Sequence, residues 1–161
     1  MAIQLNVGCK TLIKTGTGAS NALEELGYTV DGVSIDHRMY REDIHSDQHG
    51  GTSGPPSDIM IHGEVHIITL DMVYWDPAVA SKMQYVKGTT AGEVGSPCTL
   101  MFGDDKYYRV LLTGTGFTRN YLRVLPTSNN LSRIGTHASL LRLTLEAYPD
   151  DDDVLWNTTT A

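Results

Sequence analysis

The sequence predicts a mainly β protein, on two observations. Apolar and polar residues alternate along several segments, which is the two-residue period of strands with one buried face. Glycine is also abundant, with 16 among 161 residues, and each glycine weakens a helix interior by about 1 kcal/mol relative to alanine. With 40% hydrophobic and 19% charged residues, the chain has the composition of a folded globular protein. We expect a single β domain over residues 1–149 and an acidic, threonine-rich tail over residues 150–161 that orders only against a partner.

Strands are expected wherever the alternation is clear. The segments are residues 3–7, 33–42, 99–102, 107–113, 121–125 and 136–148. The pair Asp31-Gly32 is typical of hairpin turns. Residues 21–27 fit either one or two helical turns ended by Gly27 or an irregular loop. A glycine-rich loop is expected over residues 87–97.

One helix is expected after the longest apolar segment, over residues 76–85. Asp76 is a good N-cap, and Pro77 suits the first helical position. Apolar residues follow at positions 79, 83 and 86, at helical spacing.

An exposed loop and a doubly apolar strand lie next to each other in the centre of the chain. Residues 46–57 are almost all turn formers and small polar residues, so they have nothing to bury. Residues 59–75 are apolar at odd and even positions alike, which predicts burial of both strand faces. We expect another subunit to cover one of these faces.

Composition excludes several partners and compartments. The chain has 12 basic and 19 acidic residues, and a net charge of −7 disfavours tight nucleic-acid binding. Cys9 and Cys98 match no metal spacing and are expected to be small buried hydrophobes, with a disulfide between them as the alternative. No apolar run is long enough to span a bilayer, and the N-terminal residues predict no export signal or membrane partner.

No constellation in the sequence predicts catalysis, a metal or a cofactor. His62 and His66 lie four apart, but along a strand this places them about 13 Å apart, too far to share one ion. His45 and His49 share the spacing, within the loop. The chain has no nucleophile elbow, and Gly16-Thr17-Gly18 lacks the rest of a dinucleotide fingerprint. The protein is therefore expected not to be an enzyme.

The order of segments resembles the tail tube proteins of tailed bacteriophages. The resemblance rests on residues 26–33 with the long strand after them, on residues 54–64, on the strand that runs into Trp75-Asp76-Pro77, and on the last strand, residues 141–150. It implies a β-sandwich or half-barrel with one short flanking helix and a long exposed hairpin loop. It also implies hexameric rings that stack into a tube through which DNA passes.

The resemblance assigns two regions to subunit contacts and none to catalysis. The assembly loop would be formed by Asp47, Gly50, Gly51, Gly54, Pro55 and Pro56. The subunit-contact strand would present Ile59, Ile61, Val65, Ile67, Leu70, Val73 and Trp75.

The implied partners are further copies of the chain, other virion proteins and DNA as transient, non-specific cargo, in a virion assembled in the host cytoplasm. Two other functions remain open at this point. A capsid cement or decoration protein has a similar β-rich build, and a small β-barrel ligand-binding module would use the apolar strand as a pocket wall.

Overall fold

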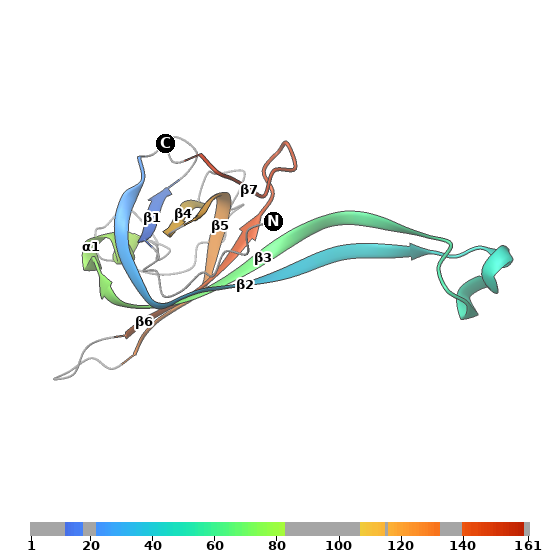
Figure 1. The fold of residues 1–161 in the computed structure, drawn as a ribbon, viewed down its shortest axis with the longest axis horizontal. Coiled ribbons are helices and arrows are strands. Elements are labelled where there is room, and N and C mark those ends of the chain that lie inside the picture. The colour runs from blue at the N-terminus through green and yellow to red at the C-terminus, as the bar shows by residue number, and fades with distance from the viewer. Residues whose placement is uncertain (1–11, 18–21, 83–106, 115, 133–139, 160–161) are drawn as a thin grey trace, which may run out of the picture.

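The computed structural model describes residues 12–17, 22–82, 107–114, 116–132 and 140–159 (Figure 1). Most of this part is antiparallel strand, which confirms the mainly β prediction. The strands are β1 (Leu12–Thr17), β2 (Glu24–Ile44), β3 (Asp58–Trp75), β4 (Tyr108–Gly114), β5 (Phe117–Ser132), β6 (Leu140–Tyr148) and β7 (Trp156–Asn157). Two 3-10 turns, η1 (Asp47–His49) and η2 (Gly51–Ser53), connect β2 to β3.

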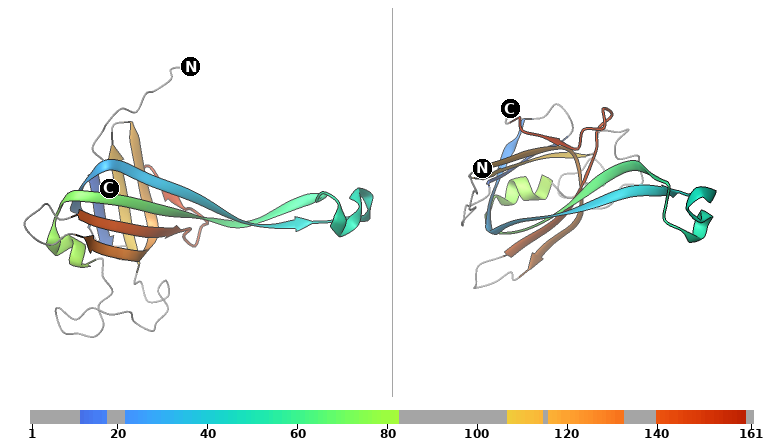
Figure 2. Two further views of the ribbon diagram at one scale, coloured as in Figure 1. Left: turned by 90° about the horizontal axis from the view of Figure 1, so that it is seen from below. Right: turned by 45° about the vertical axis from the view of Figure 1, so that its right-hand side comes forward.

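The strands form one sheet that closes on itself. Their order is β4-β1-β2-β3-β6-β5-β7, and β4 also pairs with β5. This additional pairing brings the sheet back to its first strand, so that all strands except β7 enclose one interior. Figure 2 shows β2, β3 and β6 crossing over β1, β4 and β5. The expected β-sandwich or half-barrel is confirmed, with the further finding that the pairing is continuous around it.

The interior of the closed sheet is filled by apolar side chains from alternate strand positions. The ten most deeply buried members of this core are Leu26, Ile68, Met72, Val110, Leu112, Tyr121, Val124, Leu143, Leu145 and Ala147. Burial of such side chains stabilises the fold by about 25 cal/mol per Å² of apolar surface. The two-residue period read from the sequence therefore identifies the inward positions of β6.

The expected flanking helix follows β3 directly as α1 (Pro77–Lys82). The Asp76 carboxylate accepts a hydrogen bond of 2.8 Å from the backbone N–H of Ala78, as expected of an N-cap. Val79 is buried against the core. Within the described part of the chain, no helix is long and apolar enough to cross a membrane.

β2 is longer than the sequence predicts, because the expected turn at Asp31-Gly32 is a bulge within one strand. Thr29 lies opposite Met72 and Val33 lies opposite Leu70, so residues 30–32 face a single residue of β3. Gly32 has a φ of +83°. Glycine permits the positive φ that both hairpin turns and β-bulges need. The pair Asp31-Gly32 alone therefore does not tell a turn from a bulge.

The start of β2 corrects a second expectation. Residues 24–27, considered as helical turns or a loop, belong to the strand, and Leu26 is fully buried in the core. Tertiary burial of this side chain outweighs the weak local preference for a helix.

Residues 150–159 also differ from the prediction, since they are ordered against their own chain. Trp156 and Asn157 pair with β5, and Leu155 is buried. Arg123 Nη2 lies 2.8 Å from Asp151 Oδ2 and ties the acidic turn to the sheet. The prediction of a tail gave weight to the four consecutive aspartates. It missed Leu155, the buried apolar side chain that anchors this segment to the fold.

Several expectations fall on residues outside the described part. These are the strands at residues 3–7 and 99–102, the loop at residues 87–97, and both cysteines.

Candidate functional site

A long two-stranded arm leaves the closed sheet, and it is the candidate functional site. β6 pairs with β3 only from His66 to Met72, whereas β2 and β3 remain paired out to Ile44 and Asp58. We call residues 38–65 the arm. Figure 1 shows the arm extending far from the rest of the described chain, with η1 and η2 at its tip.

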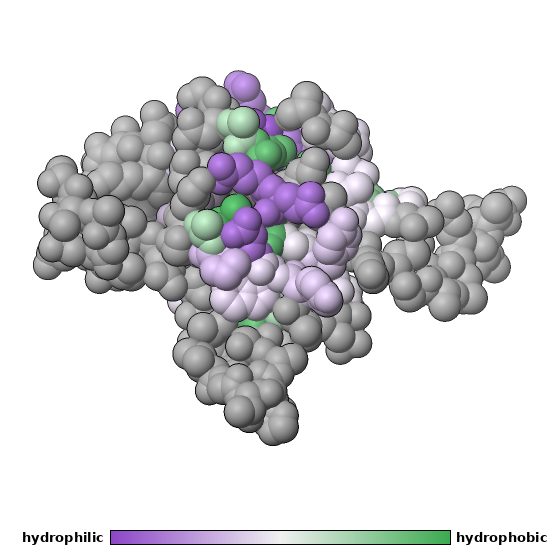
Figure 3. Space-filling view, turned by 90° about the vertical axis from the view of Figure 1, so that its left-hand side faces the viewer, coloured by the Kyte–Doolittle hydropathy of each residue, from purple (hydrophilic) through white to green (hydrophobic). Residues whose placement is uncertain are grey.

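The arm carries large apolar side chains that its own chain does not cover. The exposed members are Met39, Tyr40, Ile44, Ile59, Met60 and Ile61. Ile61 is 60% exposed and Met60 is 50% exposed, which is unusual for side chains of this size in adjacent positions. On the opposite end of the molecule, shown in Figure 3, described apolar residues appear only as small areas among hydrophilic ones. A cluster of this kind is typical of a surface that another protein covers.

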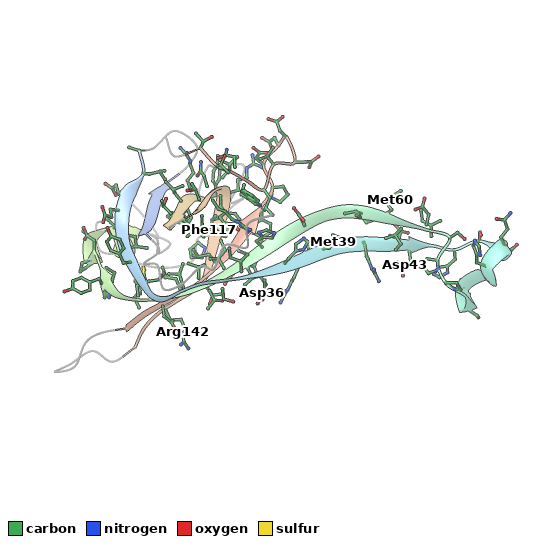
Figure 4. The ribbon with its side chains drawn as sticks, in the orientation of Figure 1. Asp36, Met39, Asp43, Met60, Phe117 and Arg142 are labelled. Carbon is green, nitrogen blue, oxygen red and sulfur yellow. The ribbon has the colours of Figure 1, made fainter. Side chains whose placement is uncertain are left out.

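The two strands of the arm differ in chemistry. Ile59, Met60 and Ile61 of β3 lie opposite Asp43, Glu42 and Arg41 of β2, respectively. At these three pairs the apolar side chains are on β3 and the charged ones on β2, while β2 adds exposed apolar side chains of its own at Met39, Tyr40 and Ile44. Figure 4 shows this for Met60 on β3 and Asp43 on β2. A neighbour could recognise such an arm by apolar contact on one side and by charge on the other.

The arm also has unpaired strand edges. Among the described residues, the outer edge of β3 has no strand partner before His66, and the outer edge of β2 has none after Tyr28. Exposed edges present unused backbone N–H and C=O groups that can pair with another strand. The arm therefore offers both side-chain and backbone contacts to a neighbour.

The residues predicted as the assembly loop lie together at the tip of the arm. Asp47 is in η1, Gly50 and Gly51 take positive φ values of 89° and 62°, and the two prolines lead into β3. Gly54 packs so closely that an added Cβ would lie 1.6 Å from the His49 carbonyl oxygen. The tip is thus a defined pair of turns held by local backbone contacts, and its role in assembly stays a prediction.

The residues predicted as the subunit-contact strand separate into two groups. Ile59 and Ile61 are exposed on the arm, while Val65 and Leu70 are buried within the chain's own fold. Ile67 and Trp75 are half-buried, and the side chain of Val73 lies outside the described part. Among the described side chains of this set, the chain itself therefore covers those near the closed sheet wholly or in part, and it leaves Ile59 and Ile61 on the arm exposed.

At the root of the arm the structure brings together side chains that the sequence did not connect. His37 lies directly opposite His66, and their rings meet edge to face with centroids 5.2 Å apart. His37 Nε2 lies 2.6 Å from Glu64 Oε2. His62, which the sequence spacing compared with His66, instead pairs with Glu42 at 3.1 Å.

His66 is held on its inner side by the core. Its Nδ1 lies 3.0 Å from the Tyr121 hydroxyl, which also accepts a hydrogen bond from Arg119 Nη1 at 3.3 Å. Burial lowers the pKa of His66, Glu64 opposes this shift, and His37 and Arg119 add to it. Burial also raises the pKa of the Tyr121 hydroxyl. Near neutral pH, His66 is therefore an uncharged imidazole beside a neutral phenol.

A cavity of about 440 Å³ lies elsewhere, between β4, β5 and the acidic turn. It is lined by Tyr107, Arg109, Leu122, Arg123 and residues 150–152. None of these residues belongs to β3, so this cavity is not the pocket expected of a ligand-binding module walled by the apolar strand.

Comparisons with known proteins rest on structure alone. No family model matches the sequence, and no curated protein sequence matches it. The fold is similar to that of a chain from the tail of an empty GTA particle, solved with helical refinement and C6 symmetry. That match has a TM-score of 0.52 and 12% identity, and it covers 92% of this chain and 95% of the other.

A second similarity is to a chain of the six-fold symmetrised baseplate of the anti-feeding prophage. Its TM-score is 0.39 at 11% identity, with 90% of this chain and 92% of the other covered. It adds nothing to the argument. The chain therefore shares its fold with the first of these two structures.

Proposed function

We propose that this protein is a virion structural protein, and more specifically a tail tube subunit that forms stacked, hexameric rings around a channel for DNA. The observation that carries the proposal is the arm, whose exposed apolar side chains are left uncovered by the chain itself. The fold shared with a chain from a C6-symmetric particle tail supports it.

The chemistry of the arm favours a head-to-tail contact between copies. Near the tip, β3 presents residues 59–61, which are apolar, and β2 presents residues 41–43, which are charged, so each strand would bind a different part of a neighbour there. Contacts between unlike surfaces generate rings when the rotation closes. Rings built in this way leave the tip of every arm available for the next ring, which would make the tip a stacking contact.

The charge of the chain suits a conduit for DNA. Non-specific binding to DNA is driven mainly by the cations that phosphates release when basic side chains neutralise them. A chain with a net charge of −7 offers a channel wall that does little of this. DNA would pass without being held. Other virion proteins would cap the tube at its two ends, and assembly would take place in the host cytoplasm.

Deletion of residues 50–56 is expected to weaken assembly and to spare the monomer fold. The Ser57 N–H donates to the Ile44 carbonyl at 2.7 Å, so the arm is already closed below the tip. The deletion leaves residues 47–49 as a three-residue connection between Ser46 and Ser57, within the usual range of about 2–5 residues for hairpin loops.

Circular dichroism and sedimentation velocity on the wild type and the deletion variant test this expectation. A stacking role for the tip is supported if the deletion variant keeps the native circular dichroism spectrum and its sedimentation distribution shifts toward the monomer. Assembly as strong as in the wild type would remove the tip from the proposal. A capsid cement protein would stay small until given capsids, and a ligand-binding module would stay monomeric.

A further inference from the structure

We propose that His37, Glu64 and His66, at the root of the arm, form a binding site for one divalent transition-metal ion of the zinc type. This site goes beyond the proposed function and does not depend on assembly. Its residues belong to two strands of one chain.

The three donor groups are already close to ligand geometry. Each side chain offers one ligand atom, and these atoms all lie within 4.8 Å of one another. A tetrahedral zinc ion with bonds of about 2.0–2.2 Å places its ligand atoms roughly 3.4 Å apart. His37 Nε2 and Glu64 Oε2 are 2.6 Å apart, so this hydrogen bond would open to admit an ion, and both side chains are partly exposed, which leaves them room to rotate.

The strand register fixes the arrangement. His37 and His66 are direct cross-strand partners, and Glu64 lies two residues from His66 on the same face of β3. Directly opposite side chains have Cβ atoms about 4.5–5.5 Å apart, which suits two imidazoles that share one ion. By contrast, His62 and Glu42 form an isolated pair farther out on the arm.

Tyr121 and Arg119 hold the innermost ligand, His66, in place. Metal-bound histidines usually donate their other ring N–H to an oxygen, which fixes the tautomer and the ring orientation. His66 Nδ1 is 3.0 Å from the Tyr121 hydroxyl oxygen, and Arg119 donates to the same oxygen. With Nδ1–H donating to Tyr121, the Nε2 lone pair of His66 is left for an ion.

The donor atoms favour a transition ion over calcium or magnesium. Two imidazoles and one carboxylate are ligands typical of zinc, whereas calcium and magnesium prefer oxygen donors. The partial exposure of His37 and Glu64 leaves room for a water molecule as fourth ligand.

Isothermal titration of the full, EDTA-treated chain with zinc chloride tests the site, with magnesium chloride as comparison. We expect the wild type to bind one zinc ion, and His37→Ala and Glu64→Gln each to weaken binding at least about tenfold. His62→Ala is the matched control. Like His37, His62 is an exposed histidine of the arm region that pairs with a glutamate, and its replacement should leave the affinity for zinc unchanged. Cobalt should give the visible spectrum of a low-coordinate site in the wild type and lose it in both variants.

Three results would overturn the proposal. The first is a wild type that takes up no zinc. The second is equal affinity in the wild type, His37→Ala and Glu64→Gln, which would place the ion elsewhere, for example on the acidic turn. The third is a loss of binding in His62→Ala as large as that in His37→Ala. Thermal unfolding gives an independent readout, since zinc should raise the Tm of the wild type and of His62→Ala alone.

Discussion

Replacement of Ile61 by aspartate is expected to abolish self-assembly and to leave the monomer folded. Ile61 is 60% exposed on the arm, so the monomer loses no core contact when the side chain changes. In an assembled contact the new carboxylate would be buried without a partner, which costs several kcal/mol. The association constant should fall by about 100-fold or more, equivalent to roughly 2.7 kcal/mol.

Sedimentation velocity across a concentration series measures this effect, with circular dichroism as the check on folding. Tyr74→Asp is the matched control, because Tyr74 lies on the same strand, is 80% exposed and is located away from the arm. We expect a much smaller effect there. If Ile61→Asp assembles as the wild type does, then the arm is not the contact surface.

Replacement of Gly27 by alanine is expected to cause a large loss of stability. Gly27 has a φ of +151°, and an added Cβ would lie 2.1 Å from the backbone oxygen of Tyr74. Backbone atoms of a paired strand cannot move away cheaply, so strain and overpacking add up. We expect the free energy of unfolding to fall by about 3 kcal/mol or more.

Gly63 provides an unusually close control for this prediction. Its φ is +149°, nearly that of Gly27, but an added Cβ would meet nothing within 4 Å. Gly63→Ala should therefore cost only the conformational part, about 1–2 kcal/mol. Urea denaturation of both variants separates the two contributions, and equal losses would contradict the structural role of the β2 to β3 contact at Gly27.

Period-two alternation predicted the last strand well, because only one of its faces is buried in the core. Leu141, Leu143 and Leu145 alternate with polar residues, and they occupy inward positions of β6. The Asp-Gly turn rule failed at Gly32. A glycine with positive φ can form either a hairpin turn or a bulge, and Gly32 forms a bulge within β2.

The boundary of the arm could not be predicted from composition. Ile59 and Ile61 look the same in the sequence as Ile68 and Leu70, yet the first pair is exposed and the second is in the core. The difference arises because β6 covers β3 only from His66 inward, and the extent of that pairing is a property of the whole fold.

The histidine cluster was missed for a related reason. Sequence spacing compares residues along one strand, and along β3 it correctly separates His62 from His66. The partner of His66 is His37, 29 positions earlier in the chain, and only the register of β2 against β3 reveals it. The strand patterns of the two segments predict that each forms a strand, but they leave the register of one against the other undetermined.

The central claim is that copies of this chain cover one another's arms to build a tube. Negative-stain electron microscopy of the purified full-length protein at increasing concentration tests it most directly. We predict rings that stack into open-ended tubes with a central channel. A protein that remains strictly monomeric at the highest attainable concentration, with its arm still exposed, would contradict the claim.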